Sequence, residues 1–135
     1  MGRALKVLTR ADIITINRRM IQLFGGIYFQ NDDNLANPGS LDYVLEAIQG
    51  SLFGRELFPT TLEKAAAIGF RTITRHVFHD GNKRTGMEAC RLFLEQNGYL
   101  MRIDREVVEV AIKIASNQIS LEEFGQWLAT RTEMQ

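Results

Sequence analysis

The side chains best suited to chemistry lie in one short segment, residues 76–85. His76 supplies an imidazole, Asp80 a carboxylate, and Lys83 and Arg84 two cations. An imidazole titrates near neutral pH and can take a proton from an attacking hydroxyl, so His76 is a candidate general base. Carboxylate oxygens are ligands that Mg²⁺ prefers, so Asp80 is a candidate metal ligand. Each residue alone would pass for a helix cap or a solvated charge, but the spacing of all of them predicts a site.

The same segment has the properties of a polyphosphate site. We expect Lys83 and Arg84 in the first turn of a helix, where an exposed cation is disfavoured by roughly 0.3–1 kcal/mol. A bound anion would reverse that sign, and the free backbone N–H groups of a helix N-terminus suit phosphate. Gly81 would let the backbone turn tightly or approach a ligand closely. Lys83 stands four residues before Met87, in line with a buried stripe, so we expect its side chain to point towards the fold.

Two predicted helices hold this segment between them. Apolar residues recur at helical spacing on both sides of it, so it reads as a helix–loop–helix corner. The first of the two helices begins at Thr60 or Thr61 and is apolar almost all round, which is typical of a central helix. Phe78 is expected to anchor the loop in the core, and Gly98 ends the second helix. The periodic positions are Ala66, Phe70 and Ile73, then Met87, Cys90, Phe93 and Leu94.

Two further helices are predicted before residue 60. Thr9 caps the first of them, and Gly25-Gly26 end it. Ser40 is expected to cap the second, whose apolar stripe runs through Gly50 as far as Leu52. The first helix is expected to bury Ile13, Ile16, Met20, Ile21 and Phe24, and to carry Arg10, Asn17 and Arg18 off that face.

Residues 25–39 are the least regular part of the chain. Ile27-Tyr28-Phe29 is a short apolar run with strand-like character, followed by turn residues. Two interpretations of its aromatic side chains stay open at this point. They are either exposed as a partner surface or tucked into the core.

The C-terminal part completes an all-α fold. Asp104 is expected to cap a fifth helix, and Ser120 with Glu123 forms a capping box at the start of a sixth. The polar tail, residues 130–135, is expected to fray. The predicted fold is a compact bundle of about six helices, in a single domain over residues 1–135.

Composition narrows the class of protein. The 135 residues carry 16 basic and 16 acidic side chains, so nothing global suggests nucleic acid or an anionic membrane as a partner. The single cysteine, Cys90, excludes an internal disulfide and lies on an apolar stripe, which favours a core position. No apolar run is long enough to cross a membrane, and the start lacks the apolar core of a signal peptide. We therefore expect a cytoplasmic protein.

The central segment resembles a known family motif. His76-Val77-Phe78-His79-Asp80-Gly81-Asn82-Lys83-Arg84 is similar to the Fic/Doc (Fido) motif, H-x-F-x-(D/E)-(G/A)-N-(G/K)-R. Residues 8–13 and 93–99 resemble the family's Doc branch, and the resemblance covers roughly residues 5–128. It implies a Fic/Doc helical bundle with a short flap between the first two helices, which lays a target segment across the site by main-chain pairing. It also implies that Gly81, Asn82, Lys83 and Arg84 hold phosphate oxygens of ATP, beside Mg²⁺ on Asp80 and the base His76.

Two positions bear on the reaction. Many Fic enzymes have a glycine where this chain has Lys83 and a second arginine where it has Met87, and those enzymes typically transfer AMP. Doc-like members carry the lysine, lack the second arginine, and are thought to bind ATP reversed and deliver its γ-phosphate. The resemblance therefore favours a kinase over an adenylyltransferase, which remains the alternative.

The resemblance also implies a biological role. A Doc-like toxin would phosphorylate a threonine or serine hydroxyl, with elongation factor Tu as the expected target, and so arrest translation. Many Fic proteins inhibit themselves with a helix that carries (S/T)-x-x-x-E-(G/N), and this sequence has no such segment. Inhibition is therefore expected in trans, from a small antitoxin whose disordered tail folds on binding.

Two other functions are alternatives for this sequence. His79-Asp80 is also the pair that metal-dependent HD phosphohydrolases use, but those enzymes need a further histidine on a distant helix. This chain has only two histidines, and His76 lies three residues from His79, so that class is disfavoured. The other alternative is a non-catalytic nucleotide-binding module on the same scaffold.

Overall fold

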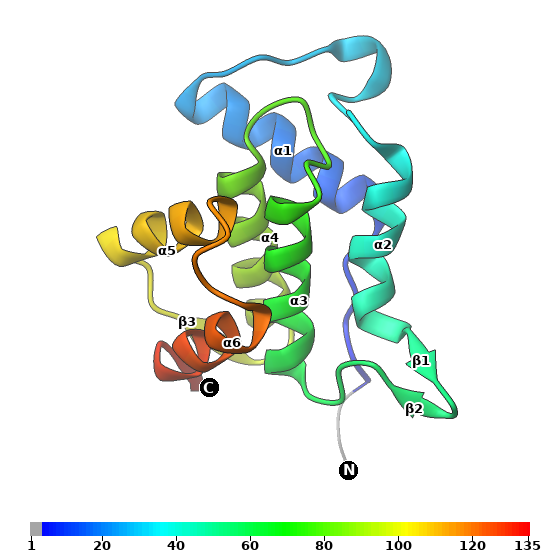
Figure 1. The fold of residues 1–135 in the computed structure, drawn as a ribbon, viewed down its shortest axis with the longest axis vertical. Helices are drawn as coiled ribbons and strands as arrows, with labels where there is room; N and C mark the ends of the chain where they lie inside the picture. The colour runs from blue at the N-terminus through cyan, green and yellow to red at the C-terminus, as the bar shows by residue number, and fades with distance from the viewer. Residues whose placement is uncertain (1–3) are drawn as a thin grey trace.

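The computed structural model describes residues 4–135 and confirms the predicted helical class (Figure 1). Within those residues the α-helices are α1 Arg10–Phe24, α2 Pro38–Gln49, α3 Thr61–Thr74, α4 Asn82–Gln96, α5 Arg105–Ala115 and α6 Leu121–Thr130. The short elements are the 3₁₀ helix η1 Gln30–Asp32 and the strands β1 Ser51–Leu52, β2 Arg55–Glu56, β3 Tyr99–Met101 and β4 Thr132–Met134. The strands form two antiparallel pairs, β1 with β2 and β3 with β4. None of the helices among these residues is both long and apolar enough to cross a membrane.

Helices α3 and α4 form the centre of the molecule. Figure 1 shows α2 on one side of this pair, α5 and α6 on the other, and α1 across the top. The two central helices meet backbone to backbone, because a Cβ added at Gly86 would lie 2.8 Å from the carbonyl oxygen of Gly69. This close contact fixes the end of α3 relative to the start of α4, and the candidate site lies between those two ends. The largest fully buried side chains include Ile68, Ile73, Phe78, Phe93, Leu94 and Phe124.

The predicted helix caps are largely confirmed. Thr9 and Asp12 form a capping box at α1, and Thr60 accepts a hydrogen bond from the N–H of Glu63 at α3. Asp104 caps α5, and Ser120 with Glu123 forms the predicted capping box at α6. Local sequence determines these helix starts because each cap satisfies backbone donors within three residues of itself.

The second helix differs from the prediction at both ends. It begins at Pro38 and not after Ser40, since proline already has the φ angle of a first helical residue and needs no N–H there. It ends at Gln49, and Gly50 takes an extended conformation with Leu57 packed close to its Cα. Leu52 therefore lies in the β1–β2 hairpin with 59% of its surface exposed, and its predicted place on the buried stripe was wrong.

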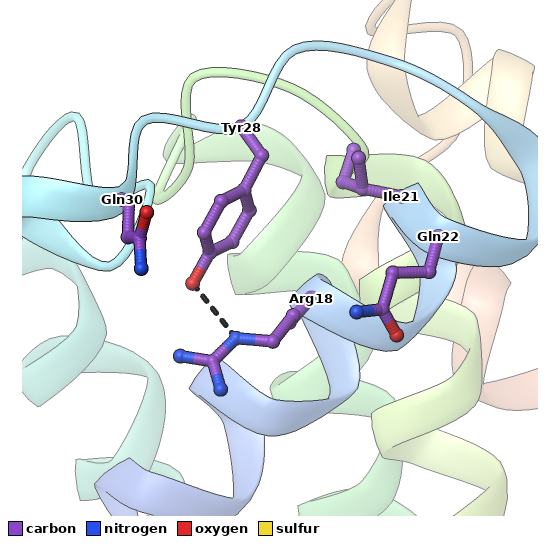
Figure 2. Close-up of a pocket in the computed structure, with 5 residues that line it drawn as sticks. All are labelled: Arg18, Ile21, Gln22, Tyr28 and Gln30. Atoms are coloured by element: carbon purple, nitrogen blue, oxygen red, sulfur yellow. Dashed lines mark hydrogen bonds between the residues drawn. The ribbon is translucent and has the colours of Figure 1, made fainter.

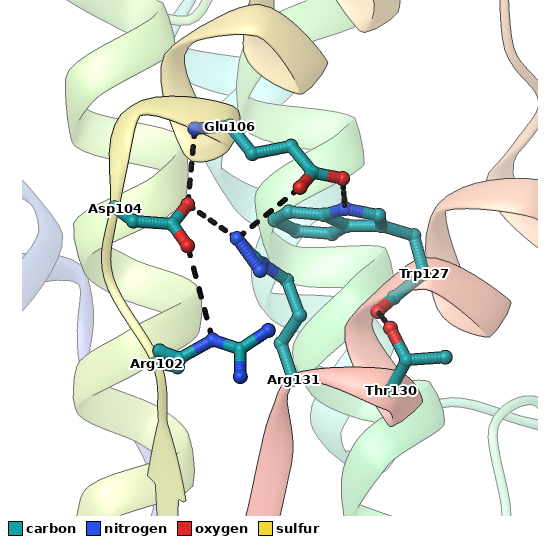
Figure 3. Close-up of polar contacts among 6 residues, drawn as sticks. All are labelled: Arg102, Asp104, Glu106, Trp127, Thr130 and Arg131. Carbon is teal, nitrogen blue, oxygen red and sulfur yellow. Dashed lines mark hydrogen bonds and ion pairs between the residues drawn. The ribbon is translucent and has the colours of Figure 1, made fainter.

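The prediction of a frayed C-terminal tail was also wrong. Strand β4 pairs with β3, with Leu100 opposite Glu133. Arg131 is 4% exposed, with its guanidinium over the ring of Trp127 and paired to Asp104 and Glu106 (Figure 3). The tail is held by main-chain pairing and by one long side chain whose stem is buried, and a polar composition does not rule out either.

Candidate functional site

The site begins where α3 ends. The helix stops at Thr74, and His76 takes a left-handed conformation with φ 47°, which leaves its side chain exposed. Val77 and Phe78 are then buried, and the predicted anchoring role of Phe78 is confirmed by its 1% exposure. Asn82 closes the loop, because its side chain accepts from the N–H of Phe78 at 2.9 Å and donates to the Phe78 carbonyl at 2.8 Å. These two hydrogen bonds between Phe78 and Asn82 hold the loop against the first turn of α4.

Helix α4 begins with no side-chain cap. Gly81 is its N-cap residue, with φ 78°, and an added Cβ would lie 2.9 Å from Cδ1 of Ile21 and 3.1 Å from Nδ2 of Asn17. Only glycine fits this position without strain. Since no side chain in the described part of the chain, residues 4–135, accepts a hydrogen bond from the first turn, its backbone N–H groups can serve an external anion.

Two cations follow in that first turn, as predicted. Lys83 and Arg84 are both exposed, and no carboxylate of residues 4–135 lies within ion-pair distance of either. The guanidinium of Arg84 lies 4.5 Å from the ring centroid of Phe24. The site therefore holds two cations that form no ion pair with a carboxylate of residues 4–135.

The prediction that Lys83 points into the fold was wrong. Its spacing from Met87 places it near the buried stripe, and Met87 is indeed 6% exposed. Side chains on a helix lean towards its N-terminus, however, so a first-turn residue projects beyond the end of the helix. No element covers Lys83 there, and the side chain is exposed.

Asp80 is half-buried, and both of its carboxylate oxygens accept backbone hydrogen bonds. Oδ1 accepts from the N–H of Gly81 at 2.8 Å, and Oδ2 accepts from the N–H of Ile27 at 2.9 Å. The Ile27 and Gly81 N–H groups hold the pKa of the Asp80 carboxyl below its usual range, and Lys83 and Arg84 act in the same direction. The carboxylate is therefore ionised at neutral pH.

This donor set fits a nucleotide-bound Mg²⁺. Each oxygen of Asp80 keeps a second lone pair for a metal ion. Residues 4–135 contain no group of three or more His, Cys, Asp or Glu side chains that could enclose a metal. Mg²⁺ is commonly held by one or two carboxylates together with substrate phosphates, and a single carboxylate beside a phosphate-binding helix end suits that arrangement.

A flap loop, residues 25–37, lies against the segment that carries these residues (Figure 1). The N–H of Ala36 donates to the carbonyl of Val77 at 2.9 Å, and the N–H of His79 donates to the carbonyl of Asn34 at 2.9 Å. The expected flap between the first two helices is thus present. Its strand-like prediction was wrong, since the only regular element within it is η1.

The two aromatic side chains of the flap loop lie at the surface and not in the core. Phe29 is 52% exposed, and Tyr28 is half-buried with its hydroxyl bonded to the exposed Arg18. The neighbouring Ile27 is 57% exposed. The His79 ring lies edge-on to Phe29, with centroids 4.8 Å apart, and its Nε2 is 3.2 Å from a carboxylate oxygen of Asp32. His79 therefore faces the flap loop, which does not suit its use beside Asp80 in an HD-type metal centre.

Two predictions for α1 were wrong, and both concern the site. Asn17, expected off the buried face, is fully buried, and Phe24, expected on it, is 57% exposed beside Arg84. The Asn17 side chain donates to the Asp80 carbonyl at 2.9 Å and to the Thr85 hydroxyl at 3.1 Å. Its position four residues from both Ile13 and Ile21 was the available signal, because i and i+4 share a helix face.

A cavity of about 360 Å³ adjoins the flap loop, lined by Arg18, Ile21, Gln22, Tyr28 and Gln30 (Figure 2). Arg18 crosses it and donates to the Tyr28 hydroxyl at 3.0 Å. Ile21 lines this cavity and also contacts the start of α4, since its Cδ1 lies against Gly26 and Gly81. The cavity therefore borders the helix end where Lys83 and Arg84 lie.

Comparison with known proteins agrees with this geometry. The family model described as Fic/DOC family matches residues 7–94, which include the whole site, and the chain belongs to that family. It is 24% identical over 110 residues to "Protein kinase doc" of Escherichia phage P1, with 82% of each chain covered. It is 31% identical over 100 residues to "Toxin Doc" of Mycolicibacterium smegmatis, with 74% of this chain and 71% of the relative covered. Within the family, the chain falls in the Doc-like branch.

Proposed function

We propose that this chain is a Doc-like toxin that transfers the γ-phosphoryl group of ATP to a threonine or serine hydroxyl of a protein. The observation that carries the proposal is the start of α4, where residues 4–135 provide no side-chain cap and no ion-pair partner for the two cations that stand beside an ionised carboxylate. Phosphoryl transfer depends mainly on positioning and on neutralising charge, and this helix end offers both. The names of the two relatives, a protein kinase and a toxin, support the same reaction and role.

Each side chain has a role in this reaction. His76, exposed at the end of α3, takes the proton of the attacking hydroxyl. Lys83 and Arg84 neutralise phosphate oxygens, and the backbone N–H of Asn82 donates to them, since its side chain is engaged with Phe78. Gly81 provides the close approach, because its own N–H already donates to Asp80.

Asp80 would hold Mg²⁺ on the phosphates. The metal, when bound, would neutralise charge on the phosphate oxygens and fix their orientation. The chain's own contribution is a carboxylate held by two backbone N–H groups, so its direction is set before nucleotide arrives.

Position 87 supports phosphoryl transfer over AMP transfer. Fic enzymes that transfer AMP carry a second arginine where this chain has Met87, and the Met87 side chain is 6% exposed and packed in the core. The chain therefore offers no guanidinium at position 87, one turn beyond Arg84, for a longer run of phosphates. Lys83 takes the place of the glycine in those enzymes and adds one cation at the helix start.

The substrate and the inhibitor are both proposed to be proteins. Three exposed apolar side chains lie beside the motif: Phe24 against Arg84, Ile27 next to Asp80, and Phe29 against His79. Exposed apolar side chains beside a charged site suit a protein surface better than a small molecule. We take elongation factor Tu as the substrate, in the cytoplasm, and a small antitoxin as the inhibitor in trans.

Intact-protein mass spectrometry tests the proposal. Purified elongation factor Tu would be incubated with the chain, ATP and Mg²⁺, beside a His76→Ala variant. A phosphate-sized gain that is lost with the variant is the expected result. An AMP-sized gain would replace the kinase with an adenylyltransferase. No gain on elongation factor Tu or in a whole lysate would leave a nucleotide-binding module as the function.

A further inference from the structure

Two buried asparagines connect α1, the flap loop and the start of α4. Asn17 and Asn34 are both fully buried, and Nδ2 of Asn34 donates to Oδ1 of Asn17 at 3.0 Å. From this pair the hydrogen bonds run outward in two directions. Asn17 donates to the Asp80 carbonyl and to Thr85, and Asn34 bonds to the backbone of Ile27 and of another flap residue.

The flap side of the network holds Ile27 at both of its backbone groups. Asn34 Nδ2 donates to the Ile27 carbonyl at 3.0 Å, and the Ile27 N–H donates to Oδ2 of Asp80 at 2.9 Å. Asn34 Oδ1 accepts from the N–H of Phe29 at 2.9 Å, which fixes the same stretch of flap two residues further on. The position of the Ile27 donor is therefore set by Asn34.

Asp80 is consequently held on two sides by one network. Its backbone carbonyl accepts from Asn17, and its carboxylate accepts from the Ile27 N–H that Asn34 positions. A Cβ added at Gly26 would lie 2.8 Å from Oδ2 of Asp80, so the flap backbone also packs directly on the carboxylate. Rotation of that carboxylate would require the flap loop to move.

The network is costly to build, which argues against an incidental role. A buried amide is tolerated only when its polar atoms are hydrogen-bonded, and here every polar atom of both amides has a partner. Asn34 also has φ 63°, a left-handed conformation that asparagine accepts more readily than most residues. Fully satisfied polar networks of this kind specify one arrangement of the groups they connect.

We infer that Asn17 and Asn34 are positioning residues that orient the Asp80 carboxylate towards Mg²⁺–nucleotide. The inference rests on the proposed function, because it gives these two amides a role at the proposed metal site. Neither side chain reaches the reacting atoms. They act through the Ile27 N–H and the Asp80 backbone.

The test measures binding of Mn²⁺ with the non-hydrolysable nucleotide AMP-PNP by water-proton relaxation, and hydrogen exchange of the Ile27 amide without ligand. Asn34→Gly removes the amide and accepts the positive φ, and Asn17→Ala removes the other end within a helix. The matched control is Asn97→Ala, since Asn97 also makes three side-chain hydrogen bonds to backbone groups, at the opposite end of α4.

We expect each network variant to weaken Mn²⁺–nucleotide binding about 10-fold, as loss of groups that orient a metal ligand commonly does. Exchange at Ile27 should become faster in both variants, and the double variant should be little weaker than either single one, because the two amides act together. Asn97→Ala should change neither quantity. A purely structural role would lower the melting temperature of all three variants and leave Mn²⁺ binding to the folded protein unchanged.

The outcomes separate this inference from the function on which it rests. If the wild-type chain binds Mn²⁺–AMP-PNP and the network variants bind it equally well, the positioning role is wrong and the proposed site stands. If the wild-type chain binds none, the proposed metal site fails and the inference fails with it. Additive losses in the double variant would also overturn it, since they would show two independent effects.

Discussion

Two helix N-termini in this molecule treat charge in opposite ways. At α5, Asp104 caps the helix, Glu106 lies in its first turn, and Arg131 pairs with both (Figure 3). At α4 no side chain caps the helix, and Lys83 and Arg84 stand in the first turn without a carboxylate partner in residues 4–135.

The difference separates structure from function. The α5 end satisfies its own partial positive charge with acidic residues, which is the stabilising arrangement. The α4 end carries two cations, which a helix N-terminus disfavours unless an anion binds there. We therefore infer that the α4 end is adapted to an anionic ligand and that the α5 end is part of the scaffold. The predictions below test that contrast, from the largest expected effect to the smallest.

Replacing the proposed base should have the largest effect and should not touch the fold. His76→Ala is expected to reduce phosphoryl transfer by about 10²–10⁴-fold, the usual range for loss of a general base. The side chain is exposed, so the melting temperature should stay the same. The rate of phosphate incorporation into the target tests the expected loss of transfer, and thermal unfolding tests the unchanged melting temperature. An unaltered kcat in this variant would show that His76 is not the general base.

Removing a cation from α4 should weaken nucleotide binding without weakening the fold. Lys83→Ala is expected to lower the affinity for Mg²⁺–AMP-PNP by about 10- to 100-fold, because a hydrogen bond to a charged phosphate is worth about 1.5–3 kcal/mol. The free energy of unfolding without nucleotide should be unchanged or higher by up to about 1 kcal/mol, since a cation at a helix N-terminus is unfavourable. Calorimetric titration and urea unfolding measure the two effects. Lower stability together with unchanged affinity would contradict the contrast drawn above.

Removing the cation near α5 should do the reverse. Arg131→Ala deletes a buried stem and leaves two acidic side chains without their partner, so we expect a loss of about 2 kcal/mol in the free energy of unfolding. Nucleotide affinity at the distant α4 end should not change. The matched comparison is Arg102→Ala, because Arg102 is exposed and lies 3.8 Å from the same Asp104, and its loss should cost little.

The two helix ends should share a response to acid. The pKa of Asp104 lies below its usual value because Arg131 donates to it, and the pKa of Asp80 lies below its usual value because Ile27 and Gly81 donate to it. A carboxyl with a lowered folded pKa contributes stability above the unfolded value of about 3.9, and that contribution is lost as pH falls through the folded pKa.

Urea unfolding between pH 5 and pH 2 checks this direction. The wild-type chain should lose stability as the pH falls below about 4, and Asp104→Asn and Asp80→Asn should each lose less over the same range. If a variant loses as much stability between pH 5 and pH 2 as the wild-type chain does, the aspartate it lacks is not held by the contacts described. Mg²⁺ is left out of these measurements, so that only the protein's own contacts are compared.

Much of the fold followed from local sequence. The caps at Thr9, Thr60, Asp104 and Ser120 lie where the sequence predicted them, since each bonds within three residues of itself. The errors arose where a local preference met a tertiary contact. Polar residues 130–135 resembled a frayed end, and pairing with β3 orders them.

The site shows the same division. The first-turn position of Lys83 and Arg84 was predictable from the motif and the helix period, and the anchoring of Phe78 from its apolar character. The direction of the Lys83 side chain was not, because it depends on what lies beyond the end of α4. The burial of Asn17 was visible in its helical spacing, but its polar character favoured the surface until Asn34 provided a partner.

The sequence by itself determined the helices, most of their starts and the order of the residues along the loop. Those features depend on hydrogen bonds and apolar spacing within a few residues. Only the tertiary structure decided how the Asp80 carboxylate is held. Its bond from Ile27 spans 53 positions in the chain, and its carbonyl's bond from Asn17 spans 63. Such contacts form only after α1, the flap loop and α4 have packed together, so no local pattern of residues records them.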